Sequence, residues 1–262
     1  MKNHILKIAS WKRLRRPTAI AAATLSLAAL ASCGGSDDPA SPDGGDGGGG
    51  ETPAAQAFEV TMTNLSAGQP LSPAVAIVHD SAYSLFRIGS AATTGLERLA
   101  EGAETEPLLA ELVDQTAVKA SATSTGGPVG PGASTQFMVT VPGSTDGAAS
   151  LQISLASMLV NTNDAIAALN GGDLSALAAG ESMTATLISY DTGTEDNTET
   201  AATMPGPAAG GEGFNVARDD LRDAVHIHAG AVTADDGLST SVLSSIHRWQ
   251  HPVARLVIRR IR

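Results

Sequence analysis

The sequence contains very little cysteine and few aromatic residues. Cys33 is the only cysteine among 262 residues, so the chain cannot form an internal disulfide bond. Aromatic residues make up 3% of the chain, which leaves no stacking platform for single-stranded nucleic acid. The 27 acidic residues outnumber the 16 basic ones, and such a surface repels phosphate backbones. We therefore expect no disulfide-stabilised fold and no nucleic acid as a partner.

The sequence also lacks an apolar run long enough to span a bilayer, which takes roughly 20 residues. Its apolar run from about Ala19 to Ala31 follows a short basic segment, the layout of a secretory signal. The run ends in Leu30-Ala31-Ser32-Cys33, the pattern of a bacterial lipobox. We expect residues 1–33 to be a lipoprotein signal peptide whose cleavage leaves Cys33 as the lipidated first residue.

The lipid on Cys33 predicts where the protein is located. Each buried methylene contributes about 0.8 kcal/mol, so several acyl chains on one residue form a firm membrane anchor. Gly34, rather than Asp, follows the cysteine and predicts the outer membrane of a bacterial cell envelope. Removing the signal takes away six basic residues and no acidic one, which leaves ten against twenty-seven and a net charge near −17. Such a surface concentrates divalent cations.

Residues 34–56 are rich in Gly, Asp and Pro and contain no apolar period. This composition predicts a disordered linker, because too little apolar surface is present to offset the entropy of ordering it. Residues 57–262 are long enough to bury close to 70% of their unfolded surface in one domain. We therefore expect a signal, a linker and one domain.

Alternating polar and apolar residues dominate this domain and predict strands with one buried face. The fold class we expect is mostly β, with helices only at Thr94–Leu99 and Pro107–Val113, where leucines recur at helical spacing. Turn residues in the range 142–147 predict a hairpin between two of the strands. The expected strands are Phe58–Thr63, Thr135–Val141, Leu151–Leu155, Met183–Ile188 and Val253–Arg262.

Two acidic segments follow apolar strands and carry the chemistry that the sequence supports best. Asp164 ends the first segment, and Asp191 and Glu195 bracket Gly193 in the second. Gly193 can adopt a positive φ, which lets two side chains four residues apart turn toward one point. Calcium takes six to eight oxygen ligands and mixes carboxylates with backbone carbonyls. Asp164, Asp191 and Glu195 are therefore a candidate calcium site, and the alternative is a solvated acidic loop.

At these residues the chain resembles the spondin N-terminal domain family. The segment Tyr190-Asp-Thr-Gly-Thr-Glu195 is similar to a family motif that holds calcium together with an upstream aspartate, here Asp164. The resemblance implies a C2-like antiparallel β-sandwich with the ion at one end, and a role in adhesion or matrix contact like that of animal members. Further segments carry the likeness: Asn64-Leu-Ser-Ala-Gly-Gln-Pro-Leu-Ser-Pro73, Leu99-Ala-Glu101-Gly, Pro205-Gly-Pro207 and Trp249-Gln-His-Pro-Val-Ala254.

A histidine pair forms the second candidate site. His226 and His228 are two residues apart on an expected strand, so their side chains share a face. Such a pair with a third ligand can bind zinc or copper, and His247 and His251 follow near Trp249. The alternative is that these histidines, like His79, pack or hydrogen bond without binding a metal.

Three functions remain open at this point. The leading one is an envelope lipoprotein with a calcium-binding, spondin-like module that binds a protein or glycan ligand. The second is a metal-dependent enzyme that uses His226 and His228, although the sequence contains no Gly-X-Ser-X-Gly or phosphate-binding motif and predicts no catalytic residue. The third is a purely structural envelope lipoprotein.

Overall fold

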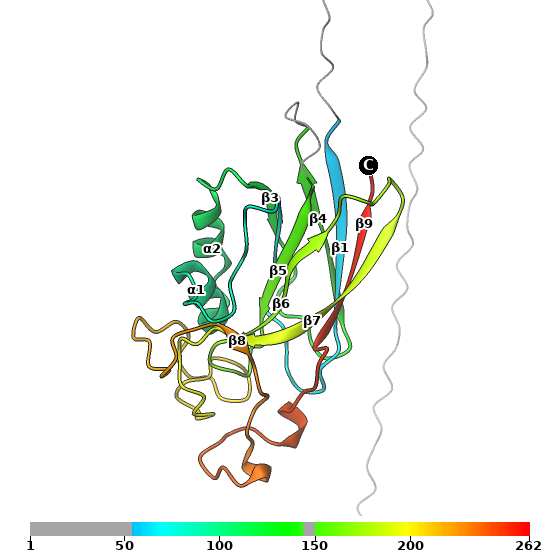
Figure 1. The fold of residues 1–262 in the computed structure, drawn as a ribbon. Coiled ribbons are helices and arrows are strands. Elements are labelled where there is room, and N and C mark those ends of the chain that lie inside the picture. The colour runs from blue at the N-terminus through cyan, green and yellow to red at the C-terminus, as the bar shows by residue number, and fades with distance from the viewer. Residues whose placement is uncertain (1–53, 144–149) are drawn as a thin grey trace, which may run out of the picture. The chain divides into compact units, whose positions relative to one another are not determined.

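The computed structural model describes residues 54–143 and 150–262. The predicted signal peptide, the lipidated Cys33 and nearly all of the predicted linker lie outside these residues. Within them the domain is mostly β, with two short α-helices and two 3-10 turns (Figure 1). No helix in residues 54–143 or 150–262 is long and apolar enough to cross a membrane.

The strands form an antiparallel β-sandwich in the order β3-β2-β5-β6-β7-β9-β1-β4, and β8 pairs with the end of β7. β7 belongs to both sheets, because Ser182–Leu187 pair with β9 and Ile188–Asp191 pair with β6. The strand bounds are β1 Gln56–Asn64, β2 Val75–His79, β3 Val118–Thr123, β4 Ser134–Val141, β5 Gln152–Met158, β6 Ala165–Asp173, β7 Ser182–Asp191, β8 His226–Ile227 and β9 Ala254–Arg260.

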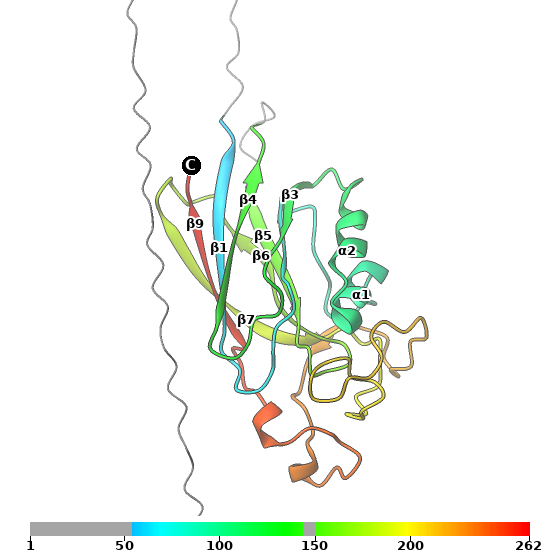
Figure 2. The ribbon, with the colours of Figure 1, turned by 180° about the vertical axis from the view of Figure 1, so that it is seen from behind.

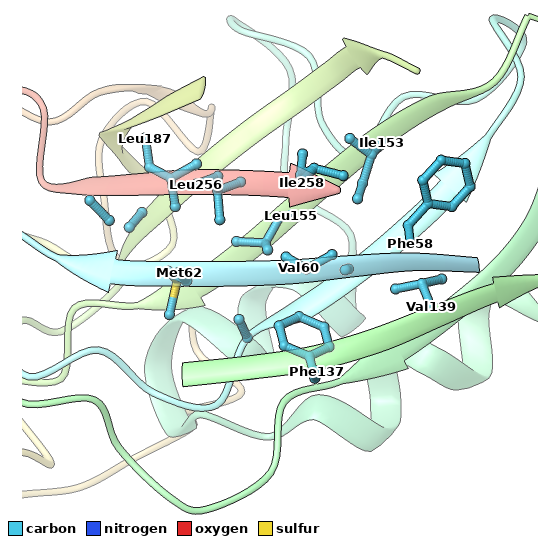
Figure 3. Packing of buried hydrophobic residues seen from close by; sticks show 14 of the residues in the cluster. Phe58, Val60, Met62, Phe137, Val139, Ile153, Leu155, Leu187, Leu256 and Ile258 are labelled. Carbon is cyan, nitrogen blue, oxygen red and sulfur yellow. The ribbon is translucent and has the colours of Figure 1, made fainter. Parts of the chain in front are cut away.

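The main core lies between the two sheets. Alternate residues of β1, β4 and β9 point inward and pack against the facing side chains of β5 (Figure 3). Phe58 and Val60 are fully buried there, whereas Glu59 and Thr61 between them are partly exposed. This alternation is the pattern from which these strands were predicted. The labelled core residues are Phe58, Val60, Met62, Phe137, Val139, Ile153, Leu155, Leu187, Leu256 and Ile258.

A second core lies between the β2-β5-β6 sheet and the helices α1 (Thr94–Gly102) and α2 (Thr105–Leu112), which cover its outer face (Figures 1 and 2). In β2, Val75 and Ile77 point toward the helices while Ala76 and Val78 point into the sandwich. Strands buried on both faces carry no polar alternation. For this reason β2 and the buried first half of β6 were missed in the sequence, and the partly exposed β3 was missed as well.

Both predicted helices are present with slightly different ends. Thr93 caps α1 by accepting a hydrogen bond from the amide of Leu96 at 3.2 Å. At the other end Ala103 adopts a left-handed conformation with φ of 57° and ends the helix. These caps satisfy amide and carbonyl groups that a helix leaves free at its ends. Helix α1 therefore extends three residues beyond the predicted Leu99.

The prediction of a hairpin around residues 142–147 is wrong, because the strands before and after these residues do not pair with each other. β4 pairs with β1, and β5 pairs with β2 and β6, so the connection from β4 to β5 crosses between strands that are not hydrogen bonded. Turn residues show where a strand ends but not where the next strand begins. Residues 144–149 themselves lie outside the described ranges.

Long irregular loops gather at one end of the sandwich (Figure 1). They comprise residues 192–225, between β7 and β8, and residues 228–253, between β8 and β9. The start of β1 and the carboxyl terminus lie at the opposite end (Figures 1 and 2). Asp191 ends β7, so the acidic segment predicted from the sequence lies at the loop end.

Candidate metal centre

Strand register brings two of the three predicted ligands together. Asp164 directly precedes β6, Asp191 is the last residue of β7, and Ala165 pairs with Asp191 across these antiparallel strands. The amide of Thr192 then approaches the carbonyl oxygen of Asp164 at 3.4 Å. The β6–β7 hairpin therefore places both carboxylates at the same end of the sandwich.

The loop after β7 wraps around the carboxylate of Asp164. Its Oδ2 accepts hydrogen bonds from the amide of Thr194 at 2.9 Å, from the amide of Glu195 at 3.2 Å and from the hydroxyl of Thr192 at 3.2 Å. Its Oδ1 is buried and has no hydrogen-bond partner among the described residues. One oxygen of Asp164 therefore organises the loop, and the other is free for a ligand.

Asp191 shapes the same loop from the strand side. Its Oδ1 accepts a hydrogen bond from the amide of Gly193 at 2.8 Å, and its Oδ2 accepts one from Nδ2 of Asn197 at 2.6 Å. Gly193 has a φ of +70°, as the sequence predicted. A left-handed residue at this position turns the chain back, which directs the amides of Thr194 and Glu195 at Asp164.

Glu195 is buried beside this loop, with 5% of its surface exposed, and its Oε2 has no hydrogen-bond partner among the described residues. Burial, followed by the charges of Glu101 and Asp164, raises the pKa of Glu195 to about 8. Burial, followed by the charge of Asp191, also raises the pKa of Asp164. Two buried carboxyl groups thus disfavour ionisation unless a positive charge joins them.

The structure brings the three predicted ligands to one region but not into a finished coordination shell. Within residues 54–143 and 150–262, no group of three His, Cys, Asp or Glu side chains has the arrangement of a metal centre. The donor chemistry nevertheless fits a hard cation, since Oδ1 of Asp164 and Oε2 of Glu195 are buried carboxyl oxygens without hydrogen-bond partners among the described residues. An ion here would be held by Asp164, Glu195 and Asp191.

The histidine pair lies on the other side of Asp191. Nε2 of His226 and Nε2 of His228 are 3.7 and 3.8 Å from Oδ2 of Asp191, so the two rings do share a face. Nδ1 of His226 lies 3.0 Å from the carbonyl oxygen of Ala224 and can only donate to it, which leaves the lone pair of Nε2 free.

His228 has the opposite tautomer. Its Nδ1 accepts a hydrogen bond from the amide of Gly230 at 2.9 Å, so in the neutral ring the proton is on Nε2. A metal at Nε2 would require that proton to leave and the bond to Gly230 to break. Burial also lowers the pKa of His228. The hydrogen bonds therefore favour His226 as a nitrogen ligand and disfavour His228.

The other histidines of the described residues have ordinary structural partners. Nδ1 of His79 lies 2.8 Å from the carbonyl oxygen of Asp80, and its Nε2 lies 2.8 Å from the hydroxyl of Ser154. Nδ1 of His251 accepts from the amide of Ser189, and Nδ1 of His247 accepts from the amide of Ser244. These hydrogen bonds agree with the structural interpretation of His79 made from the sequence.

Two buried acids near the site were missed. Glu101 is fully buried at the end of α1, and Glu199 is 3% exposed and accepts from the amide of Val232 at 3.1 Å. Burial raises the pKa of both carboxyl groups. Glu97 and Glu101 lie one turn apart on α1, where the loop at residues 213–218 contacts both. The sequence does not reveal the path of this loop.

Comparison with known proteins agrees with this architecture. The family model described as Spondin_N matches residues 64–208, which include β2 to β7, both helices, and the acids at positions 164, 191 and 195. The chain matches no curated protein. The family match covers more than half of the chain, from the end of β1 into the loops after β7. The chain therefore belongs to the spondin N-terminal domain family.

Proposed function

We propose that this protein is an envelope lipoprotein whose domain binds calcium at Asp164, Asp191 and Glu195 and presents its loop end to a protein or glycan ligand. Membership of the spondin N-terminal domain family indicates an extracellular binding module. For this chain we add three points to that coarser role: a bound calcium ion, a lipid on Cys33 and a location at the outer membrane.

The observation that carries the proposal is the unpartnered Oδ1 of Asp164. A buried carboxylate oxygen without a partner costs free energy, because the group has lost its water and gained nothing in return. The opposite oxygen of Asp164 is held by two backbone amides, so the carboxylate cannot turn away to find solvent. A hard divalent cation satisfies both the charge and the missing contact, with Glu195 and Asp191 as neighbouring ligands.

The position of the chain ends supports presentation of the loops. The predicted linker joins the domain at β1, and the loops lie at the opposite end of the sandwich (Figure 1). An anchor at Cys33 would therefore be attached to the domain at the end opposite the proposed ligand surface.

Exposed apolar residues support a ligand surface on these loops. Monomeric proteins seldom expose many large apolar side chains in one region, and such surfaces often contact a partner. Much of the exposed apolar surface of the described residues lies in the loop segments and β8: Val216, Leu221, Ile227, Val232, Val242 and Ile246. An ion bound at Asp164 would order the base of the 192–225 loop, which carries Val216 and Leu221.

Thermal unfolding of the purified full chain with calcium and with a chelator tests the proposal. Calcium at ten times its dissociation constant stabilises the fold by about 1.4 kcal/mol. For a domain of this size that corresponds to a melting temperature about 3 to 6 °C higher. We expect this difference in the wild type and its loss in Asp191→Asn. Equal melting temperatures of the wild type in both conditions would remove calcium from the account.

Capture from envelope fractions tests the binding role. The chain is immobilised through its carboxyl terminus, at the end opposite the loops, and exposed to envelope extract with calcium or with chelator. We expect a protein or glycan to be retained only with calcium, and to be released by chelator. Equal retention of a ligand by the wild type and by Asp191→Asn would show that ligand binding does not depend on the calcium ion.

A further inference from the structure

Glu101 is an acid in an unfavourable position. It lies in the last turn of α1, where the helix dipole disfavours a negative charge, and no part of it is exposed to solvent. Its Oε2 accepts a hydrogen bond from the amide of Asn215 at 2.9 Å. Its Oε1 is buried and has no hydrogen-bond partner among the described residues. Something outside the described side chains must therefore compensate this carboxylate.

The nearest arginine does not supply that compensation. Arg218 binds Glu97 with two hydrogen bonds, from Nη2 at 2.6 Å and from Nε at 3.0 Å. Its Nη1 donates to Asp223 at 2.9 Å. These contacts engage the three guanidinium nitrogens with other carboxylates, so Arg218 reduces the repulsion around Glu101 only from a distance.

Glu101 lies beside the proposed calcium ligands. Burial raises the pKa of Glu101 and the nearby Thr194 side chain opposes that rise, while the hydroxyl of Thr194 is 3.3 Å from Oδ2 of Asp164. Among the charges that raise the pKa of Glu195, the charge of Glu101 acts most strongly. The Thr194 side chain thus lies near the carboxylates of Glu101 and Asp164, and Glu195 is the next residue in the chain.

Glu101, Asp164 and Glu195 share one feature. Each has one carboxylate oxygen that is buried and without a partner in residues 54–143 and 150–262: Oε1 of Glu101, Oδ1 of Asp164 and Oε2 of Glu195. They come from three separate segments, the end of α1, the turn before β6 and the loop after β7. Buried carboxylate oxygens without partners, supplied by neighbouring segments, are the kind of donor that a hard cation prefers.

We propose that Glu101 is a fourth carboxylate ligand of the bound cation, supplied by helix α1. This inference rests on the proposed calcium site and extends it to the helical layer. An all-oxygen donor set favours calcium over zinc or copper, which prefer nitrogen and sulfur. Because Oε2 of Glu101 holds the amide of Asn215, the ion also connects α1 to the loop that covers it.

Calcium binding to three variants of the full chain tests this role. Glu101→Gln removes the charge but keeps an oxygen for the amide of Asn215. We expect it to weaken calcium binding at least tenfold while its melting temperature in chelator stays equal to that of the wild type or rises, since a buried charge is gone. Glu106→Gln makes the same change at an exposed position on α2 and should leave both quantities unchanged. Glu101→Asp keeps the charge but withdraws the carboxylate, and it should also weaken calcium binding.

The outcomes separate this inference from the proposed function. If Asp164→Asn abolishes calcium binding while Glu101→Gln and Glu101→Asp bind as tightly as the wild type, Glu101 is not a ligand and the three-residue site stands. If the wild type binds no calcium, both proposals fail together. If Glu101→Gln does not fold, unchanged binding by Glu101→Asp overturns the inference and weakened binding supports it. If Glu101→Gln is less stable in chelator but binds calcium as tightly as the wild type, Glu101 has only a structural role and the inference is overturned.

Discussion

Gly193 lies directly against the backbone of Ala224. A Cβ atom at Gly193 would be 2.5 Å from both the amide nitrogen and the carbonyl oxygen of Ala224, closer than real Cβ contacts come. The loop that surrounds Asp164 is therefore wedged between β6 and the segment that leads into β8. Packing of this kind fixes the amides of Thr194 and Glu195 in place before any ion binds.

We predict that Gly193→Ala destabilises the fold and weakens the response to calcium. The substitution adds a clash with Ala224 to the cost of a left-handed conformation, which is about 1 to 3 kcal/mol for an ordinary residue. Gly210→Ala is the matched control, because Gly210 has a φ of +73° and nothing within 4 Å of an added Cβ. Chemical denaturation should show a clearly larger loss for Gly193→Ala. Equal losses would mean that the contact with Ala224 is not rigid.

Stability without calcium should fall as the pH rises. Glu195 has a pKa of about 8 in the folded chain, against an ordinary value of 4.5. The folded state therefore holds more protons than the unfolded state between these values, and the stability that Glu195 contributes below pH 4.5 is lost as the pH rises through 8. We expect the melting temperature in chelator to be lower at pH 8.5 than at pH 5.

Calcium should remove this dependence, because a bound cation stabilises the ionised carboxylate. The difference in melting temperature between calcium and chelator is thus expected to be larger at pH 8.5 than at pH 5. Glu195→Gln serves as the control, since it cannot titrate and should show a smaller fall in chelator. A wild-type melting temperature in chelator that rises over this range would contradict the assignment of Glu195 as a buried acid.

The ion pair between Arg218 and Glu97 holds the loop at residues 213–218 on helix α1. Glu97 is nearly buried, with 4% of its side chain exposed, so Arg218→Ala leaves a desolvated carboxylate and should cost about 2 to 4 kcal/mol. Lys119→Ala breaks a more exposed pair with Asp80 and should cost at most about 1 kcal/mol. Urea denaturation of both variants measures this difference. Equal losses of unfolding free energy in the two variants would show that burial does not strengthen the Arg218–Glu97 pair relative to the Lys119–Asp80 pair.

The sequence revealed the strands with clear alternation and missed β2, which is buried on both faces, as well as β3 and β6. Phe58–Thr63 and Val253–Arg262 alternate clearly, and the structure has β1 and β9 there. β2 is buried along its whole length because helices cover its outer face, so its run of apolar residues has no period to detect. Detecting it would have required knowing that α1 and α2 pack on that side of the sheet.

The candidate site was predictable where its residues lie on neighbouring strands. Asp164 and Asp191 are joined by the β6–β7 pairing, and Gly193 signalled the turn between Asp191 and Glu195. The burial of Glu101 was not predictable, because it arises from the packing of α1 against a loop more than 100 residues later in the chain. Long-range contacts between irregular segments leave no local pattern in a sequence.

Equilibrium dialysis of the purified full chain against radioactive calcium tests the central claim most directly. We predict one calcium ion per chain, with half-saturation between about 0.1 and 1 mM, as in other extracellular modules. Asp164→Asn should remove this binding, and Glu106→Gln should retain it. A wild-type chain that takes up no calcium at 10 mM, or an Asp164→Asn variant that binds as well as the wild type, would contradict the account.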